Sequence, residues 1–461
     1  MEKNKYFIVG LLILFCGLML SVNWYLYFLS FILAGLFFYL QVKNIYQAIF
    51  LICIASIPYS VGPSRSQMIS QESGYSSAYG LIPFTISTVL LSLLLLIKPS
   101  PFVIKKPDLF LVIFYIYALV GLVFKNTYFV SLYGVVQLTV MILFYFLARL
   151  MLLEKKIIPY IMWIFILILT YESTLAILQF VLQHPVGIFA EEYVYSDPFG
   201  IVSGENISLF RASGTTSHPN NLGILLVTLL PVILISYEST SLKKKPYLYL
   251  LILALLTFTI LVTYSRVALG LTIILFVLVL IRNFKKLLFR KTRYFISGVF
   301  LFVLILSLLW PQISFRLSTV TAVLEPGNSL DARIKAIEEA IPMIVKSPLF
   351  GVGINRYIEI APYFPQTDLF YNIRPSKISD IHNLFFQIVT SLGIPALIIF
   401  MIFLYSLWRE YISKINKKNS TVIVMSASGI ILFLFASMFM PTFPKPLLRL
   451  FFLYAAMLVT A

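Results

Sequence analysis

The sequence has little charge and almost no cysteine. Only 11% of its 461 residues are charged, whereas about a quarter are charged in a typical soluble domain. The two cysteines, Cys16 and Cys53, both lie inside apolar runs, so the sequence indicates neither a disulfide framework nor a cysteine metal site. Apolar residues, in contrast, make up 60% of the chain. This composition excludes an ordinary soluble domain.

Long apolar stretches recur from one end of the sequence to the other. A helix needs about 20 mostly apolar residues to span a bilayer. Runs such as 11–20 and 271–280 are continuously apolar, whereas a membrane β-barrel would show short alternating segments. We therefore predict an all-α polytopic integral membrane protein with about 12–14 transmembrane helices.

The candidate spans are separated by connections of very different length. They lie near residues 6–22, 24–41, 45–61, 81–97, 109–124, 128–148, 157–181, 217–236, 247–264, 266–282, 294–312, 381–407, 421–440 and 446–461. The shortest links fall at Asn23 and Ser265. The chain therefore divides into transmembrane parts at 1–181, 217–312 and 381–461, a loop at 182–216, and a large loop between late helices at 313–380.

Basic residues are concentrated in alternate connections. The chain holds 35 Lys and Arg against 18 Asp and Glu, and clusters such as Lys243–Lys245 and Arg409–Lys418 fall on one side of the spans. Because short cytoplasmic loops are enriched in Lys and Arg, we place these clusters and both termini in the cytoplasm. The long polar segments 62–80, 182–216 and 313–380 are then external, and the external side is nearly neutral. This distribution argues against nucleic acid as a partner.

The large loop 313–380 contains its own helix pattern. Ser329 or Asp331 can cap the helix, because a side-chain oxygen there accepts hydrogen bonds from free N–H groups of the first turn. Pro342 should kink it. One face of the helix carries an apolar stripe of Ile334, Ile337, Ile341 and Ile344. The helix should end at Pro348, Gly351 and Gly353. We expect this helix to lie against the membrane domain or along its surface.

Four external or interfacial stretches combine Arg, His, Asn and Gly. They are 211–221, 263–266, 331–333 with 347–353, and 380–383. The fixed fork of Arg donors suits phosphate oxygens, and a His can take a proton from a hydroxyl near neutral pH. If arginines and a histidine from these stretches face one cavity, they could hold a diphosphate without a metal. The pattern therefore suggests transfer chemistry on a lipid diphosphate.

The arginines of these stretches also have ordinary structural explanations. Arg266 could be a boundary residue that reaches the membrane interface. Arg211 could be a loop charge. Arg333 could pair with Glu338 or Glu339 nearby.

The histidines and one buried acid carry similar alternatives. His382 could be a cap residue at a helix start, and His218, next to a proline, could shape a turn. Glu172 falls in mid-span, where an ionisable residue is a functional candidate. Glu172 could neutralise an arginine, be protonated, or bond to Tyr171 or Ser173, and the sequence leaves these alternatives open.

Over residues 205–405 the sequence resembles the O-antigen ligase and polymerase family of bacterial surface glycan synthesis. The residues that carry the resemblance are Arg211, Gly214, His218-Pro-Asn220, Tyr264-Ser-Arg266, Asp331-x-Arg333, Ser347-Pro-Leu-Phe-Gly-Val-Gly353, His382-Asn383 and Gly393-Ile-Pro395. Their order and their topological side both match. The N-terminal half is similar only as a set of spans.

The resemblance implies an enzyme of the bacterial inner (plasma) membrane. It would transfer a glycan from undecaprenyl diphosphate to an acceptor hydroxyl on the outer face, with no metal, nucleotide sugar or other cofactor. Its partners would be the lipid-linked glycan, an acceptor glycan or lipid, membrane lipids and other polysaccharide-assembly proteins.

The resemblance also assigns residue roles. Arg211 and Arg266 would bind the diphosphate and stabilise the leaving group, and His382 would be the catalytic base. Arg333 would assist from the external loop. The remaining motif residues expected to bind substrate are His218, Asn220 and Asn383.

One departure concerns the choice between ligase and polymerase. Many ligases carry a second glycine where this chain has Ala396, and the Lys-, Ile- and Asn-rich composition suits an organism without lipopolysaccharide. We therefore favour a polymerase over a ligase. A polysaccharide flippase is the main alternative, although no inverted repeat is visible. A glycosyltransferase of the shape, elongation and division family and a non-enzymatic sensor or scaffold have no motif in their favour.

Overall fold

The computed structural model groups the chain into two compact units. The described residues are 4–59, 83–97, 102–124, 129–191, 202–204, 207–216, 218–239, 246–277, 307, 310, 314, 329–361, 380–415 and 420–461. Unit 1 combines Met1–Asn44 with Ile158–Ala322, and unit 2 combines Ile45–Ile157 with Val323–Ala461. The predicted polar segment 62–80 and most of the predicted span 294–312 lie outside the described residues.

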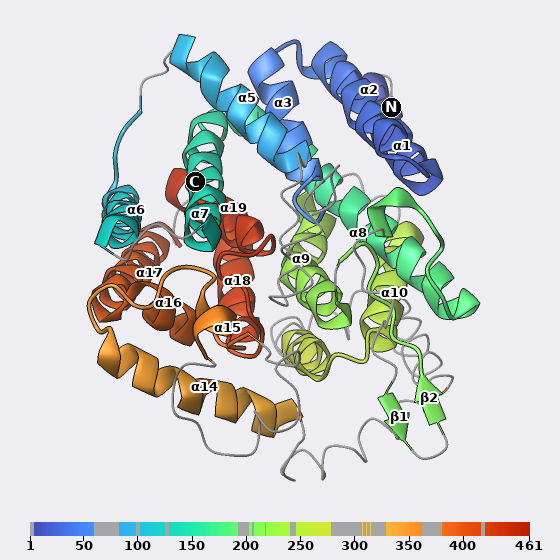
Figure 1. Cartoon of the computed structure of the whole chain (residues 1–461). Helices are drawn as coiled ribbons and strands as arrows, with labels where there is room; N and C mark the ends of the chain where they lie inside the picture. Colours follow the sequence, from blue (N-terminus) through green and yellow to red (C-terminus); the bar gives the residue numbers. More distant parts are fainter. Residues whose placement is uncertain are drawn as a thin grey trace. The chain divides into compact units, whose positions relative to one another are not determined.

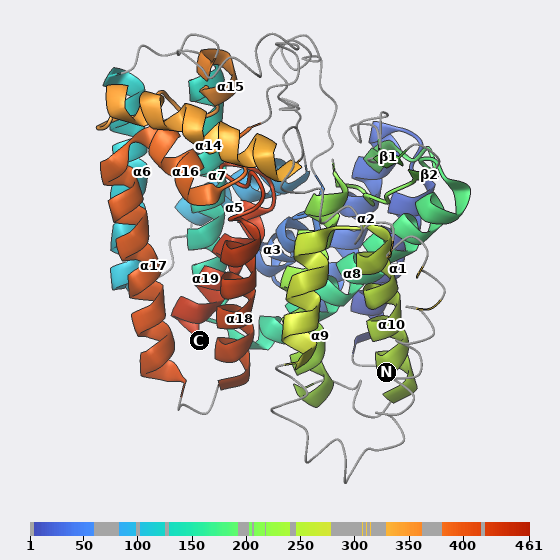
Figure 2. The same cartoon turned by 90° about the horizontal axis from the view of Figure 1, so that it is seen from below.

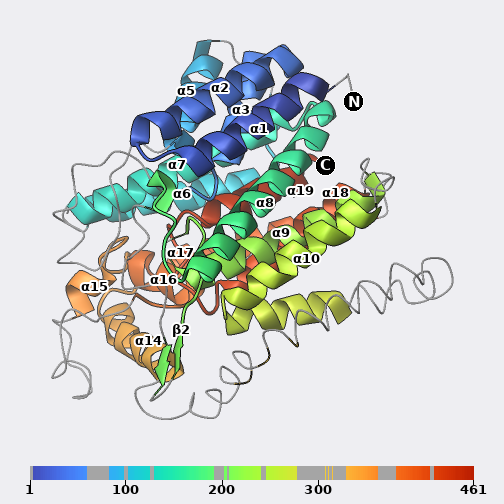
Figure 3. The same ribbon diagram turned by 90° about the vertical axis from the view of Figure 1, so that its right-hand side faces the viewer.

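Unit 1 is a helical bundle with one small hairpin. Its elements are α1 (Lys5–Leu20), α2 (Trp24–Val42), α8 (Ile158–Leu182), η3 (Phe189–Glu191), β1 (Val202–Gly204), β2 (Ile207–Leu209), α9 (Pro219–Ser239), α10 (Pro246–Val262) and an apolar helix at Arg266–Val277 (Figure 1). Helices α8, α9 and α10 pack side by side (Figure 3). Strands β1 and β2 pair antiparallel, with Val202 opposite Leu209.

Unit 2 holds the remaining helices. They are α3 (Ile45–Ala55), α5 (Pro83–Ile97), α6 (Lys106–Phe124), α7 (Phe129–Met151), η2 (Lys155–Ile157), α14 (Ser329–Lys346), α15 (Tyr357–Ile360), α16 (Leu384–Leu392), α17 (Ile394–Lys414), α18 (Ser420–Ala436) and α19 (Leu448–Thr460). Helix α17 packs against α6, and α19 packs against α7 and α18. Large aromatic side chains such as Phe114, Phe400 and Phe451 fill the core of this unit.

The helices confirm the predicted all-α polytopic membrane fold. Within the described ranges, α2, α6, α7, α8 and α17 are long and apolar enough to cross a membrane, and eight further apolar helices have 10–17 residues. The predicted links at Asn23 and Ser265 coincide with helix breaks. The β1–β2 hairpin is a small addition inside the predicted loop 182–216. The total number of spans stays a prediction.

The prediction of one continuous span at 381–407 is wrong, because the chain breaks at Gly393 into α16 and α17. Pro395 has no N–H with which to continue the helical bonding. The N–H of Ile394 donates instead to the carbonyl of Pro348, 2.7 Å away. The carbonyls that the break leaves free accept N–H groups from the turn after α14, from Val352 to Thr390 (2.8 Å) and from Gly353 to Ser391 (3.0 Å). Backbone bonds from the turn after α14 therefore replace helical bonds that the break removes.

The two ends of unit 2 differ chemically. Lys105 pairs with Glu410 near the end of α17 (3.8 Å) and donates to the carbonyl of Val459 near the end of α19 (2.6 Å). At the opposite end of α6, Phe124 stacks on Phe350 with ring centroids 5.0 Å apart. A helix of this length separates its ends by about 28 Å. The basic end and the end that carries the turn after α14 therefore lie on opposite sides of the unit.

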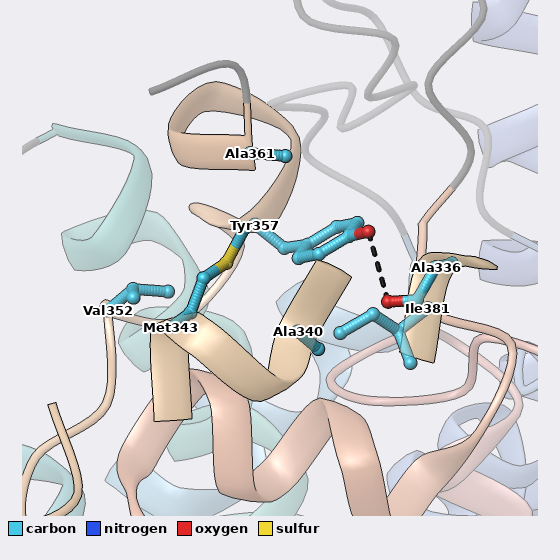
Figure 4. Close-up of a cluster of buried hydrophobic side chains, with 7 residues drawn as sticks. All are labelled: Ala336, Ala340, Met343, Val352, Tyr357, Ala361 and Ile381. Atoms are coloured by element: carbon cyan, nitrogen blue, oxygen red, sulfur yellow. Dashed lines mark hydrogen bonds between the residues drawn. The ribbon is translucent and has the colours of Figure 1, made fainter. Parts of the chain in front are cut away.

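Helix α14 lies crosswise to α6 and α17 at the Phe350 end (Figure 2). It runs through Pro342 without ending there. The predicted isoleucine stripe is only partly buried, because Ile334 and Ile341 are 47% and 49% exposed. The buried side is built around two alanines and Met343 (Figure 4): Ala336, Ala340 and Met343 form a cluster with Val352, Tyr357, Ala361 and Ile381. Ile337 and Ile344 of the predicted stripe pack against this cluster.

Candidate functional site

In unit 1, Arg211 joins two of the four polar stretches. Its Nε donates to the carbonyl of Thr263 (2.9 Å), and its Nη2 donates to Oδ1 of Asn220 (2.7 Å). The N–H of Ala212 donates to the carbonyl of Val262 (3.3 Å). The guanidinium is buried, so these bonds fix the 211–216 loop against the C-terminal end of α10.

Helix α8 holds the same loop from the other side. Glu172, which is fully buried, accepts hydrogen bonds from both the N–H (2.9 Å) and the hydroxyl of Thr215. About two turns further along α8, Oε1 of Gln179 accepts the N–H groups of Ser213 (3.2 Å) and Gly214 (2.9 Å). Among the alternatives left open for Glu172, bonding is observed, and the partner is Thr215 in a distant segment.

A second buried acid completes this network. Nε2 of Gln179 donates to Oε1 of Glu191 (2.5 Å), and the Glu191 carboxylate also accepts the N–H groups of Val186, Gly187 and Ile188. The carboxylate of Glu191 is therefore fully engaged with the chain around η3, in the external loop predicted from the sequence. The network connects this loop to α8 and to the segment that carries Arg211.

The remaining site candidates of unit 1 lie next to Arg211. Nδ1 of His218 accepts the N–H of Asn220 (3.1 Å), so His218 caps α9, whose first residue is Pro219. Arg266 is partly buried and begins the helix that follows Thr263. The structure thus brings the first two polar stretches together and gives His218 a local contact at a helix start. A role of His218 and Asn220 in substrate binding stays a prediction.

In unit 2, His382 lies just before α16. Its Nδ1 is 2.7 Å from the carbonyl oxygen of Asp380. Because a carbonyl only accepts, the neutral ring carries its proton on Nδ1 and leaves the lone pair on Nε2. Within the described part of the chain, no hydrogen bond reaches Nε2 of His382. The helix cap is the next residue, Asn383, whose Oδ1 accepts the N–H groups of Phe385 (3.0 Å) and Phe386 (3.2 Å).

Charged groups surround His382 on more than one element. Burial and the charge of Arg333 on α14 lower the pKa of His382 to about 4, and Lys445 acts in the same direction. The hydrogen bond and the charge of Asp380 oppose this shift. The ring is therefore neutral at physiological pH, with Nε2 able to accept a proton. The third and fourth polar stretches thus both belong to unit 2, where the charge of Arg333 acts on His382.

The carboxylate of Asp380 is held by three groups. Oδ1 accepts the N–H of Ile381 (2.8 Å), and Oδ2 accepts Nε2 of Gln387 (3.1 Å) and pairs with Nζ of Lys445 (2.8 Å). These groups border a narrow pocket lined by Asp380, Gln387 and Ser391 together with the rings of Tyr357 and Phe443. Its walls are mostly polar, which suits water or a hydroxyl.

Sequence reasoning missed Gln387 and Lys445 and did not assign a role to Asp380. Gln387 is a buried amide one turn after Asn383, among the apolar residues that begin α16, and this contrast is a usable signal. Lys445 offered no signal, since it lies far along the chain on the segment between α18 and α19. Within the described residues no cluster of His, Cys, Asp and Glu is arranged to hold a metal ion.

Comparison with known families finds one match, which covers a part of each unit. Residues 251–401 match the family model described as O-antigen ligase. The match covers less than half of the chain and includes Arg266, Arg333 and His382, whereas Arg211 precedes it. No curated protein matches the chain. The resemblance predicted from the motifs is confirmed, and the match supports an O-antigen ligase-like family with polysaccharide assembly of the ligase or polymerase type.

Proposed function

We propose that this chain transfers a glycan from undecaprenyl diphosphate to an acceptor hydroxyl at the outer face of a bacterial inner or plasma membrane. The observation that carries the proposal is His382, which is neutral, has its Nδ1 proton bonded to a carbonyl, and has its pKa lowered by burial and by the charge of Arg333. Both residues fall within the matched region. A base next to a cation suits a reaction that deprotonates a hydroxyl and releases an anion.

The proposed reaction is a displacement at the anomeric carbon of the donor. Nε2 of His382 takes the proton of the acceptor hydroxyl as its oxygen forms a bond to that carbon. The bond between the anomeric carbon and the phosphate oxygen breaks, and undecaprenyl diphosphate leaves with the electron pair. Arg333 stabilises the negative charge that develops on the leaving group, through donors that match phosphate oxygens.

The electrostatics of His382 fit a base that is strengthened by its substrate. With a pKa of about 4, the free histidine is a weak base. A bound diphosphate would offset the charge of Arg333 and raise this pKa toward neutrality. The base would then gain strength only when the donor is present, which limits reaction with water.

For Arg211 and Arg266 we retain the role of binding the diphosphate. The contacts of Arg211 with Thr263 and Asn220 support a second task, because they hold the loop that precedes α9. Substituting Lys for Arg separates these roles. Arg211→Lys keeps the positive charge but loses the forked set of donors. Diphosphate binding that depends on charge alone should therefore be reduced less than the positioning of the loop, which depends on the bonds to Thr263 and Asn220.

The base assignment is tested with His382→Ala. We expect glycan transfer to fall by roughly 10²- to 10⁴-fold, which is the usual contribution of a general base. His184→Ala is the matched control, since His184 is exposed and one of only three histidines in the chain. Transfer is measured with purified lipid-linked glycan in vesicles, and both variants are quantified in the membrane fraction. Undiminished transfer by His382→Ala would remove the base role.

Between the two transfer reactions we propose polymerase, on the sequence departure at Ala396. Deleting the gene and separating surface polysaccharide on a gel distinguishes the options. Loss of the ladder, with single repeat units left on lipid, is the expected result. Full-length chains that stay on lipid would indicate a ligase, and lipid-linked units accumulating in the cytoplasm would indicate a flippase.

A further inference from the structure

The backbone carbonyl of Asp380 holds the ring of His382, while the carboxylate of Asp380 is bonded to other groups. The carbonyl accepts Nδ1–H of His382 at 2.7 Å, so the orientation of the ring follows the position of the Asp380 backbone. The carboxylate is bonded to Ile381, Gln387 and Lys445. Any movement of Asp380 would therefore break several bonds and turn His382 with it.

Gln387 connects Asp380 to the segment between α18 and α19. Its Oε1 accepts the N–H groups of Thr442 (2.9 Å) and Phe443 (3.0 Å), which fixes Nε2 toward Asp380. Gln387 is buried, and so are the two N–H groups that it accepts. Loss of the amide would leave these two buried donors unpaired, which is unfavourable.

Lys445 supplies the charge that balances Asp380. Its Nζ lies 2.8 Å from Oδ2, and the segment that carries it also supplies Thr442 and Phe443 to Gln387. An unbalanced carboxylate two residues before a catalytic base would repel an anionic donor. The pair with Lys445 removes this repulsion and keeps the negative charge of Asp380 at a fixed place beside His382.

We propose that Asp380 is a positioning residue for His382, and that Gln387 and Lys445 hold Asp380 in place from α16 and from the segment between α18 and α19. The proposal rests on the proposed function for its catalytic consequence. The contacts themselves make a separate prediction about the ring of His382, which can be measured without any transfer activity.

The first arm of the test is spectroscopic. Because the chain has only three histidines, ¹⁵N-histidine labelling and solid-state NMR in lipid bilayers give few signals, and subtraction of the His382→Gln spectrum identifies His382. In the unaltered protein we expect the Nδ1–H tautomer and titration near pH 4. Asp380→Asn should lower the titration midpoint, because it removes a nearby negative charge. Lys445→Met should raise it, because it removes a positive charge.

The titratable and charged groups that face His382 give this arm its controls. They are Arg333 on α14, Asp380 on the same segment, and Lys445 on the segment between α18 and α19. Arg333→Gln should raise the titration midpoint of His382, as Lys445→Met does. Lys445→Arg keeps the positive charge and should therefore leave the midpoint at the value of the unaltered protein. Glu359→Gln removes an acid that pairs with Arg356 elsewhere in unit 2 and should leave the midpoint unchanged.

The second arm is kinetic. Asp380→Ala should reduce kcat by roughly 10- to 100-fold, as expected when a reacting group is slightly misplaced, with little change in KM for the donor. Gln387→Leu, which removes the amide but keeps the apolar packing, should act in the same direction. The acid limb of the pH–rate profile should shift in opposite directions for Asp380→Asn and Lys445→Met, whereas general damage to the fold would lower both rates without opposite shifts.

The outcomes separate this proposal from the proposed function. If the Asp380 and Lys445 variants keep the tautomer, the midpoint and kcat of the unaltered protein while His382→Ala is inactive, Asp380 does not position His382 and the function stands. If His382→Ala stays active, the base role fails, and the NMR arm still decides whether Asp380 sets the ring. Should Asp380→Ala not accumulate in membranes, the Lys445→Met and Lys445→Arg pair decides the question.

Discussion

Glu172 shows how a single acidic residue is accommodated in the middle of an apolar helix. An ionisable group at that depth is costly unless it is bonded. Both oxygens of Glu172 accept from Thr215, which belongs to the loop that carries Arg211. An acid that was a functional candidate from the sequence therefore serves a contact between a helix and a loop.

Gly214 is the residue that makes this contact possible. Its φ is +57°, and a Cβ at this position would lie 2.2 Å from Oε2 of Glu172. We expect Gly214→Ala to destabilise unit 1 by about 1–3 kcal/mol from the left-handed backbone, with a further cost from the clash. Gly270→Ala is the control, because nothing lies within 4 Å of its Cβ and its φ is not positive. Thermal unfolding in detergent compares the two, and equal melting temperatures would refute the steric explanation.

At the scale of elements, the break between α16 and α17 determines where His382 lies. Residues 384–407 are mostly apolar, so we predicted one span, although Gly393 and Pro395 are residues that commonly interrupt a helix. The break depends on backbone bonds to the turn at 348–353, which is remote in sequence. Gly393 has a φ of +88°, and a Cβ there would lie 2.0 Å from the carbonyl oxygen of Leu349.

Gly393→Ala should therefore separate the 348–353 turn from α16. We expect the free energy of unfolding to fall by about 1–3 kcal/mol from the backbone strain alone. We also expect the rate of glycan transfer to fall, because His382 would move. Limited proteolysis measures whether the turn is released, and the same Gly270→Ala variant serves as the reference. A variant that resists protease like the unaltered protein would contradict this account.

Helix α14 was predicted from the sequence, but its exposed side was not. The buried side uses Ala336, Ala340 and Met343, whereas Ile334, Ile341 and Val345 are exposed. The two alanines allow the helix to approach its neighbours closely. Ile337 and Ile344 pack against this cluster, whereas Ile334 and Ile341 are left on the outside. Periodicity locates an apolar face but does not decide which side packs on the protein.

The exposed side of α14 leads to a test of its position. Helix α14 lies at the end of unit 2 where Phe124 ends α6, and α6 is apolar enough to span the bilayer. We expect the exposed face to contact the boundary between lipid headgroups and acyl chains. Tryptophan placed at Ile341 should be quenched by lipids with shallow bromine labels, and tryptophan at Lys335 should be quenched less. Equal quenching by an aqueous quencher at both positions would exclude contact with lipid.

At the scale of the whole molecule, the sequence predicted the helices and the polar motifs well. Continuous apolar runs marked most helix ends to within a few residues, because burial in lipid requires them. The motifs pointed to Arg333 and His382, which the structure places in unit 2, and to Arg211 and Arg266, which it places in unit 1. Contacts such as Asp380 with Lys445 could not be predicted, since they join segments with no shared pattern.

The chemical difference between the two ends of unit 2 makes orientation testable. Cys16 and Cys53 are replaced by Ser, and single cysteines are placed at Leu349 and Arg409, which are both exposed and lie at opposite ends. In intact cells a membrane-impermeant maleimide should label position 349 and spare position 409, because the Lys- and Arg-rich end faces the cytoplasm. Lysed cells provide the control, where both should react. The reverse pattern would overturn the predicted topology.

The bonds between the 348–353 turn and the helix break have one more consequence, which concerns variation in length. They fasten α14, with Arg333, to α16, beside which His382 lies, so the spacing of cation and base is set by direct contact. An insertion or deletion within 348–353 would break these bonds and shift Arg333 relative to His382. We therefore expect the length of this turn to be tightly constrained.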